Sequence, residues 1–516
     1  MLTTAVPGQS RRQWIFFIFL FMPIFVLLFI LGVAITRESD VMIPLAITAG
    51  IIGIIGSMVT LGINWRIGVY MIMFFILWDR LLSFNQSGSI NATKIAIGLT
   101  IVYMLTAMFN GQLPGWGRRL IDPLVIAGVL YVFTTTFSVI FMPHTDLATA
   151  YIMRRLNIVV LMCIFLIGVT DREVFHRAIL ALILGGTLVA IATLSEPITG
   201  QGLLERMGKA KPDIGSGINV LQTYKGAFRI IGPSGGPNFY GLAQSLPSVL
   251  AFGLLLYYKE LWKKVILVLA LGVMVFNIVG TGSRSGAAGF LAGVFFVFTL
   301  CPVKHRFVKL AAVITLIIVG IFVLAALDTG VAANRLANPS EAQSPTVTRI
   351  AMWHMAVNMW TDHPWTGVGT NGWAYYYPYY RIPPVPDRLL RTHNSFMQLF
   401  AECGVQGVVS YLLLFLFAGI SAFSAAFGTR DRRLKFEAMA LASTMIGFFL
   451  FAGAENVLED ELYFIVFGMA GAAYTVYRNE KNIVRQLGKD FLLPDERHIR
   501  IKLLESRQNT HYPPGG

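Results

Sequence analysis

Long apolar runs separated by short polar connections fill the chain from residue 14 to residue 477. Each run is continuous, whereas the strands of a membrane barrel would be about ten residues long with alternating polarity. Runs near 20 residues match the thickness of a bilayer core. The pattern therefore predicts an all-α, multi-pass membrane bundle. Its predicted spans are 14–35, 41–63, 67–84, 95–110, 122–142, 156–170, 174–194, 239–258, 262–280, 286–302, 307–327, 396–426, 436–453 and 460–477.

Composition supports a membrane protein over a series of soluble domains. Hydrophobic residues make up 55% of the 516 residues and charged residues 13%, about half the charged share of a soluble protein. We therefore expect one helical domain over 1–477 and a basic tail over 478–516. The three cysteines lie far apart in apolar stretches, and no metal-ligand spacing occurs. We expect no metal and no other cofactor.

Lys and Arg positions predict the orientation of the bundle, because cytoplasmic loops are enriched in them. With a cytoplasmic N-terminus, the inner connections hold most of these residues: Arg66, Arg118, Arg119, Arg172, Arg177, Lys259, Lys263, Lys264, Lys304, Arg306, Lys309, Arg430, Arg432, Arg433 and Lys435. The short outer connections hold fewer: Arg37, Arg80, Lys94, Arg154, Arg155 and Arg284. Both termini are then cytoplasmic. The net charge of +14 follows from this bias and does not call for a nucleic-acid partner.

This orientation places every unusual polar segment outside. The two long connections, 195–238 and 328–395, both fall on the non-cytoplasmic face, and so does the turn that holds Arg284. If the protein has a chemical activity, we expect it on that face.

Two arginines are candidates for binding a phosphate group. Arg284 lies in the turn Thr281-Gly282-Ser283-Arg284-Ser285-Gly286, where a guanidinium and accessible backbone N–H groups are both available. Arg229 precedes a run rich in Gly and Pro that ends at Asn238. The alternatives are an Arg284 that binds a lipid headgroup and an Arg229 that is simply solvated in a turn.

The loop 328–395 contains a predicted helix and an aromatic cluster. Residues 345–361 place an apolar stripe on one face, with Arg349 beside it, which predicts a helix lying on the bilayer surface. The stripe is Ile350, Trp353, Val357 and Trp360. The aromatic cluster between Trp373 and Tyr380 is typical of a membrane-interface belt, and stacking on sugar rings is the alternative.

His393 is the most informative residue of this loop. It lies just before a span that we expect to begin at Ser395, since Ser395 and Gln398 have capping-box spacing. The positive end of a helix and nearby arginines favour a neutral imidazole, which can accept a proton from a hydroxyl. Glu402, farther into the span, would pair with an Arg or orient His393. A purely structural His393 is the alternative.

These residues resemble the O-antigen ligase and polymerase superfamily over about 225–425. The resemblance rests on Arg349-x-x-x-Trp353, His363-Pro364-x-x-Gly367-x-Gly369, His393-Asn394-Ser395-Phe396, Ala401-Glu402-x-Gly404-x-x-Gly407, Gly282-Ser283-Arg284-Ser285-Gly286 and Pro237-Asn238. Members commonly have about twelve spans, against fourteen predicted above.

The resemblance implies a bacterial inner-membrane glycosyltransferase with a GT-C-like helical fold. Such enzymes move a glycan, without a metal, from undecaprenyl diphosphate to lipid A–core or another glycan acceptor at the periplasmic face. Carried over by motif, His393 activates the acceptor, while Arg284 and Arg229 hold the diphosphate. Arg349, Glu402 and Asn394 would support the site.

Two other functions compete with a ligase that acts in lipopolysaccharide synthesis. A polymerase of polysaccharide repeat units would use the same donor on the same face. A flippase for lipid-linked glycans would need polar groups at mid-bilayer and inverted repeats. The sequence shows neither, because its ionisable residues collect at the ends of the predicted spans and its two halves differ in loop pattern.

Overall fold

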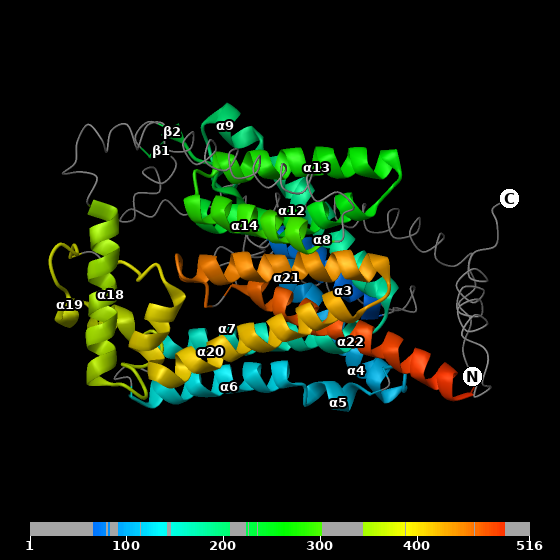
Figure 1. The fold of residues 1–516 in the computed structure, drawn as a ribbon. Helices are drawn as coiled ribbons and strands as arrows, with labels where there is room; N and C mark the ends of the chain where they lie inside the picture. The colour runs from blue at the N-terminus through cyan, green and yellow to red at the C-terminus, as the bar shows by residue number, and fades with distance from the viewer. Residues whose placement is uncertain are drawn as a thin grey trace, which may run out of the picture.

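In the computed structural model the chain folds into a bundle of helices (Figure 1). The structure describes residues 65–78, 81–82, 91–113, 115–141, 146–206, 223–224, 227–234, 236–301, 344–387, 389–458 and 460–490. The predicted spans 14–35, 41–63 and 307–327 and the tail beyond residue 490 lie outside these ranges. The boundary at 477 stays a prediction, and the last helix continues past it to Asp490.

The first half of the bundle contains α3 (Trp65–Phe75), η1 (Ile76–Trp78), α4 (Ala92–Phe109), α5 (Trp116–Leu120), α6 (Pro123–Phe137), η2 (Ser138–Phe141), α7 (Asp146–Gly168) and α8 (Arg172–Thr193). A connection follows that contains α9 (Ser195–Thr199), α10 (Leu203–Arg206) and η3 (Gly232–Ser234). Between α10 and η3, two antiparallel strands of two residues each, β1 (Thr223–Tyr224) and β2 (Ala227–Phe228), form a hairpin. The second half contains α12 (Pro237–Tyr257), α13 (Leu261–Gly280), α14 (Arg284–Leu300), α18 (Ser344–Asp362), α19 (Gly372–Tyr380), α20 (Ser395–Gly428), α21 (Arg432–Ala452) and α22 (Glu461–Asp490).

The predicted all-α membrane fold is confirmed. Within the described ranges, 8 helices are long and apolar enough to cross a membrane: Ala92–Phe109, Pro123–Phe141, Tyr151–Gly168, Arg172–Thr199, Pro237–Tyr257, Leu261–Gly280, Ser395–Gly428 and Arg432–Ala452. Trp65–Trp78 and Arg284–Leu300 are shorter apolar helices. Every predicted span in the described part of the chain overlaps a helix.

Polar residues at the helix starts explain where several helices begin. Asp122, Asp171 and Asp431 each accept a hydrogen bond from a backbone N–H in the first turn of α6, α8 and α21. Such caps satisfy amide groups that have no partner within the helix. These caps therefore determine the residue at which each helix begins, which the apolar runs alone do not define.

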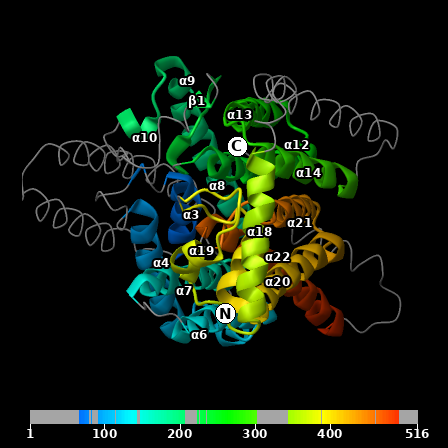
Figure 2. The same ribbon diagram turned by 90° about the vertical axis from the view of Figure 1, so that its left-hand side faces the viewer.

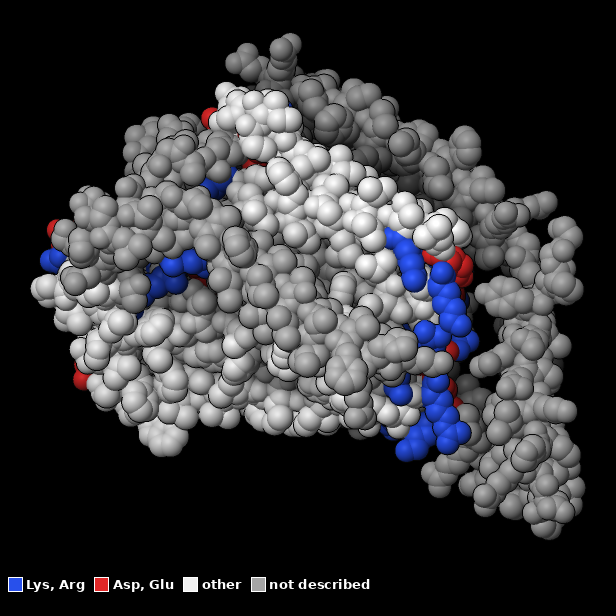
Figure 3. Space-filling model, turned by 45° about the horizontal axis from the view of Figure 1, so that its top comes forward, with Lys and Arg blue, Asp and Glu red and all other residues white. Residues whose placement is uncertain are grey.

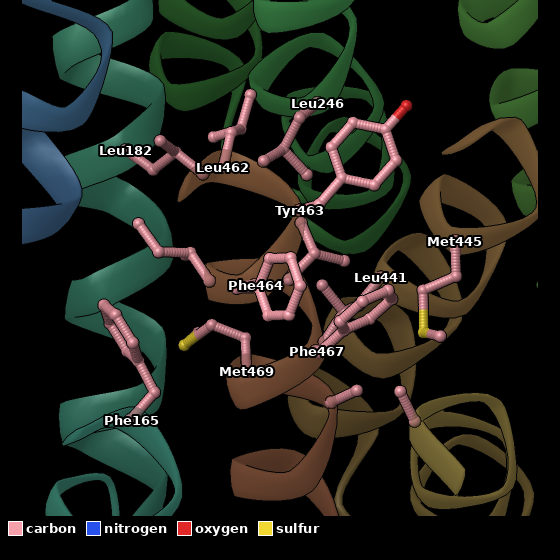
Figure 4. Packing of buried hydrophobic residues seen from close by; sticks show 14 of the residues in the cluster. Phe165, Leu182, Leu246, Leu441, Met445, Leu462, Tyr463, Phe464, Phe467 and Met469 are labelled. Carbon is pink, nitrogen blue, oxygen red and sulfur yellow. The ribbon is translucent and has the colours of Figure 1, made fainter. Parts of the chain in front are cut away.

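The core of the bundle is built around α22 (Figure 4). Phe464 and Phe467 of α22 are buried, as are Phe165 of α7 and Leu441 of α21. The ring of Phe467 packs edge to face on Phe464, with centroids 5.4 Å apart, and on Phe415 of α20, with centroids 4.9 Å apart. α22 therefore belongs to the bundle, although its charged C-terminal half lowers its overall hydropathy.

Charged side chains gather at the two ends of the bundle, and most of the described side chains that are visible between them in Figure 3 are uncharged. At one end, three ion pairs join predicted inner connections: Arg66 to Asp171, Arg172 to Asp431 and Arg433 to Glu173. At the opposite end, α18 crosses the helix ends and α19 lies beside it (Figures 1 and 2). The predicted inner and outer connections thus separate to opposite ends.

Candidate functional site

Glu455, in the connection between α21 and α22, is the centre of a polar cluster at the α18 end. Its side chain is 4% exposed. Oε2 lies 2.9 Å from His393 Nδ1, while Oε1 accepts hydrogen bonds from Asn238 Nδ2 at 2.6 Å and Arg349 Nη2 at 3.3 Å. One carboxylate therefore connects the starts of α12 and α20 with α18.

Arg229 connects this cluster to the turn that carries Arg284. Its Nε donates to the backbone oxygen of Thr281 at 2.6 Å, and its Nη2 donates to Asn238 Oδ1 at 3.2 Å. A Cβ placed on Gly282 would lie 3.3 Å from the same Nε, so the guanidinium packs directly against the turn. Asn238 thereby links Arg229 to Glu455, because its side-chain Oδ1 accepts from Arg229 and its Nδ2 donates to Glu455.

The segment that carries Arg229 is held from two sides. The buried carboxylate of Glu196 accepts hydrogen bonds from the backbone N–H groups of Ile231 and Gly232. The N–H of Ile230 donates to the backbone oxygen of Gly280 at the end of α13. These contacts satisfy buried amide groups outside regular structure, as buried backbone requires, and they fix the chain on either side of Arg229.

Arg284 is the first residue of α14 and is exposed. Ser283 caps the helix through Gly286 N–H at 3.1 Å. Among the described residues, the Arg284 side chain has neither an ion-pair partner nor a hydrogen-bond partner. A cation at a helix N-terminus is not stabilised by the helix dipole, so an anionic ligand would suit this position.

The α20 helix begins at Ser395 as predicted, but Ser395 does not cap it. Asn394, rather than Ser395, is the N-cap, and its Oδ1 accepts hydrogen bonds from Phe396 N–H and Met397 N–H. Ser395 Oγ instead donates to the Glu455 backbone oxygen at 2.9 Å and accepts from Val457 N–H at 3.0 Å. Asn394 was expected to bind substrate, but its side-chain oxygen is engaged in the cap.

Glu402 pairs with Arg155 rather than orienting His393 directly. Glu402 Oε2 lies 4.0 Å from Arg155 Nη2, and both side chains are buried. Arg155 was expected in an outer connection because charged residues tend to mark span ends, yet it lies within α7, 1% exposed. His176 and Glu437 form a second pair buried within helices. The expectation that ionisable residues collect near the span ends is kept, since all four lie within about two turns of the start of a spanning helix, but these four are buried inside the bundle rather than exposed in connections.

Two of the motifs quoted above dock on each other through their backbones. Val368 N–H donates to the oxygen of Ala401, and Val405 N–H donates to the oxygen of Pro364. Gly367 and Gly404 have φ of 62° and 65°, and any Cβ there would lie within 2.5 Å of the facing backbone. Glycine is required at both positions, and Gly404 also kinks α20.

The helix predicted over 345–361 is present as α18, but its buried face differs from the predicted stripe. Ala351, Met352, Met355, Ala356 and Met359 are buried against the segment around Val368 and Trp373. Ile350 and Val357 are exposed. The small and sulfur-containing side chains fit the closely packed inner side, which leaves the branched residues outward.

The tyrosines of α19 form a cluster of ring contacts. Tyr376 lies 5.0 Å from Tyr375 and 6.4 Å from Tyr379 and Tyr380, between centroids. Tyr380 donates a hydrogen bond to Asp362 at 2.5 Å, and burial together with this carboxylate raises the pKa of Tyr380 to about 12.

A comparison with protein families identifies the central part of the chain. Residues 269–412 match the family model described as O-antigen ligase. This part of the chain is similar to the O-antigen ligases. The predicted resemblance to the O-antigen ligase and polymerase superfamily is thereby confirmed, and no curated protein matches the chain.

At family level, the O-antigen ligase match implies a multi-pass membrane protein with a role in glycan transfer that acts on a lipid-linked glycan and an acceptor. It includes Arg284, Arg349, His393 and Glu402 but neither Arg229 nor Glu455. The structure brings Arg229, Arg349 and His393 together around Glu455, with Arg284 on the adjoining turn.

The sequence did not indicate that Glu455, Glu196, Arg155 and Asn238 take part in this polar cluster and the contacts around it. The acidic character of the last outer connection was the available signal for Glu455. In the described ranges, no three His, Cys, Asp or Glu side chains gather as a metal site would require.

Proposed function

We propose that this protein transfers a glycan from an undecaprenyl-diphosphate carrier to an acceptor hydroxyl at the periplasmic face of the bacterial inner membrane, without a metal. The proposal rests on the hydrogen-bonded cluster of His393, Glu455 and Arg349, which Asn238 joins to Arg229 and the turn of Arg284. The cluster combines a proton acceptor with cations at one end of the bundle.

His393 acts as the general base. Its Nδ1 faces Glu455, which fixes the N–H on that nitrogen and leaves Nε2 to accept a proton. The acceptor oxygen attacks the anomeric carbon, and its proton passes to Nε2. The bond from that carbon to the diphosphate oxygen breaks, and undecaprenyl diphosphate leaves with the electron pair. The carboxylate of Glu455 stabilises the imidazolium that forms.

The arginines bind the diphosphate. Diphosphate is a good leaving group, so the protein must chiefly stabilise its growing charge and position the acceptor. Arg284 offers a guanidinium on the exposed rim of the turn, and Arg229 lies against the same turn. Guanidinium groups donate in pairs to phosphate oxygens, which a metal-independent mechanism requires.

The orientation follows from the distribution of charges. The end opposite the cluster carries ion-paired arginines from connections that the positive-inside rule assigns to the cytoplasm. We therefore place both termini, including the basic tail over 478–516, in the cytoplasm and the cluster in the periplasm, within a single helical domain over 1–477.

The acceptor decides between a ligase and a polymerase. Purified protein in liposomes would be given undecaprenyl-diphosphate glycan with lipid A–core or with free repeat units, in the presence and absence of EDTA. Transfer to lipid A–core that resists EDTA supports a ligase, while chain extension supports a polymerase. Movement of the lipid-linked glycan across the bilayer without transfer would contradict the proposal and favour a flippase.

A further inference from the structure

His393 has a left-handed backbone conformation. Its φ is 50°, and among the non-glycine residues of the described ranges Asn371 is the one other with a positive φ. This conformation is unfavourable for a residue with a Cβ and persists where the neighbouring structure enforces it. The neighbours on both sides of His393 must therefore hold the backbone in place.

The residues that flank His393 are fixed. The buried Thr392 accepts a hydrogen bond on its backbone oxygen from Trp353 Nε1 at 3.0 Å. The hydroxyl of Thr392 lies 3.0 Å from Gln398 Oε1 and 2.9 Å from the Asn394 oxygen. On the other side, Ser395 is bound to the Glu455–Val457 connection.

A chain of buried polar contacts leads from Thr392 into the bundle. Gln398 Nε2 donates to Glu402 Oε1 at 2.6 Å, and Glu402 Oε2 faces Arg155 Nη2 at 4.0 Å. Arg155 Nη1 donates to Thr370 Oγ1 at 3.0 Å, in the turn after Gly369. This series of contacts thus runs from Thr392, the residue before His393, through α20 to Arg155 on α7.

The charge of Glu402 determines which group donates and which accepts in each of these hydrogen bonds. An ionised carboxylate only accepts hydrogen bonds, so Gln398 must turn its NH₂ group toward Glu402. The carbonyl of Gln398 must then face Thr392, whose hydroxyl donates to it. Arg155 provides the opposite charge that a buried carboxylate requires. Without the ionised carboxylate, either orientation of the Gln398 amide becomes possible.

We infer that Arg155, Glu402 and Gln398 are positioning residues that hold Thr392, and through it the left-handed backbone of His393, in the geometry needed for proton transfer. The inference rests on the proposed role of His393 as a base. None of the three touches substrate. They act on the placement of the imidazole, whereas the diphosphate is bound by a different part of the site.

Gln398→Met tests the inference with the buried charges left intact. It keeps a similar volume and removes both hydrogen bonds of the amide. We expect kcat to fall about 10- to 100-fold, as a small displacement of a base produces, with the KM for the lipid-linked donor changed less than about 2-fold. Gln406→Met, on the same helix, is the matched control and should leave both constants unchanged.

A second pair of variants decides the matter if Gln398→Met does not fold. Thr392→Ser keeps the hydroxyl and should retain activity, whereas the isosteric Thr392→Val should lose kcat to the same extent as Gln398→Met. The double variant Arg155→Gln with Glu402→Gln leaves no unpaired buried charge, so its protein level should exceed that of either single variant while its kcat stays low.

Normal kcat in Gln398→Met, or in Thr392→Val, overturns the inference. His393→Ala and Arg284→Ala, measured in parallel, separate this outcome from failure of the proposed function. If both are inactive while Gln398→Met is fully active, only the positioning role is wrong. If both are fully active, the proposed function itself is wrong.

Discussion

His393 Nδ1 lies 2.9 Å from Oε2 of Glu455, a residue 62 positions later in the chain. The carboxylate sits in the α21–α22 connection, so folding of the whole C-terminal half is needed to complete the site. A carboxylate at one imidazole nitrogen orients the ring and favours the tautomer that keeps the other nitrogen available. It also ties the proposed base to Arg349, which shares the same carboxylate.

Glu455→Gln should reduce transfer about 10²- to 10⁴-fold, because the neutral amide no longer stabilises an imidazolium on His393. The measurement is the initial rate of glycan transfer in proteoliposomes, normalised to the amount of folded protein. Glu260→Gln at the opposite end, where Glu260 pairs with Lys263 on the surface, is the control. A Glu455→Gln rate equal to wild type would show that the carboxylate has no part in the reaction.

Arg229→Lys should raise the KM for the lipid-linked donor about 10- to 100-fold. An ammonium cannot reproduce the simultaneous contacts of Nε with the Thr281 oxygen and of Nη2 with Asn238, and hydrogen bonds from charged groups contribute about 1.5–3 kcal/mol each. Titration of the donor at fixed acceptor measures the effect. An unchanged KM would remove Arg229 from the diphosphate site.

Gly404→Ala should lower the yield of folded protein sharply, because the new Cβ would lie 2.5 Å from the backbone of Trp365 at a φ of 65°. Gly419→Ala on the same helix is the matched control, since its Cβ would meet nothing within 4 Å. Size-exclusion chromatography in detergent after a heating series measures the difference. Equal thermal stability of the two variants would contradict the docking of residues 363–369 on α20.

Single cysteines should report the proposed orientation. Trp365 and Leu261 are 73% and 75% exposed, at opposite ends of the bundle, and can each be replaced by Cys after the three native cysteines are removed. A membrane-impermeant maleimide added to intact spheroplasts should label Trp365→Cys and not Leu261→Cys. The reverse result would place the cluster in the cytoplasm.

Much of the fold could be predicted because bilayer-spanning helices leave long apolar runs in the sequence. The approximate placement of α12, α13, α20 and α21 follows from such runs, and the turn at Arg284 follows from the small residues between two of them. Arg155 could not be predicted as a buried residue, since its partner Glu402 comes from a helix far along the chain.

The site was predictable in part for a related reason. His393, Arg349 and Arg229 share the face that the charge pattern assigns to them, but the residue that joins them does not carry a local signal. Glu455 stands in a short acidic connection that resembles a solvated surface loop. Only the packing of α21 and α22 beside α20 buries it next to His393.

The most direct test of the proposed mechanism is the initial rate of glycan transfer from undecaprenyl diphosphate by His393→Ala in proteoliposomes. Arg284→Ala serves as a second site variant, and His354→Ala on the exposed face of α18 as the control. The account predicts that His393→Ala and Arg284→Ala each fall below about 1% of the wild-type rate with normal protein level and topology, while His354→Ala stays near wild type. A wild-type rate in His393→Ala would contradict it.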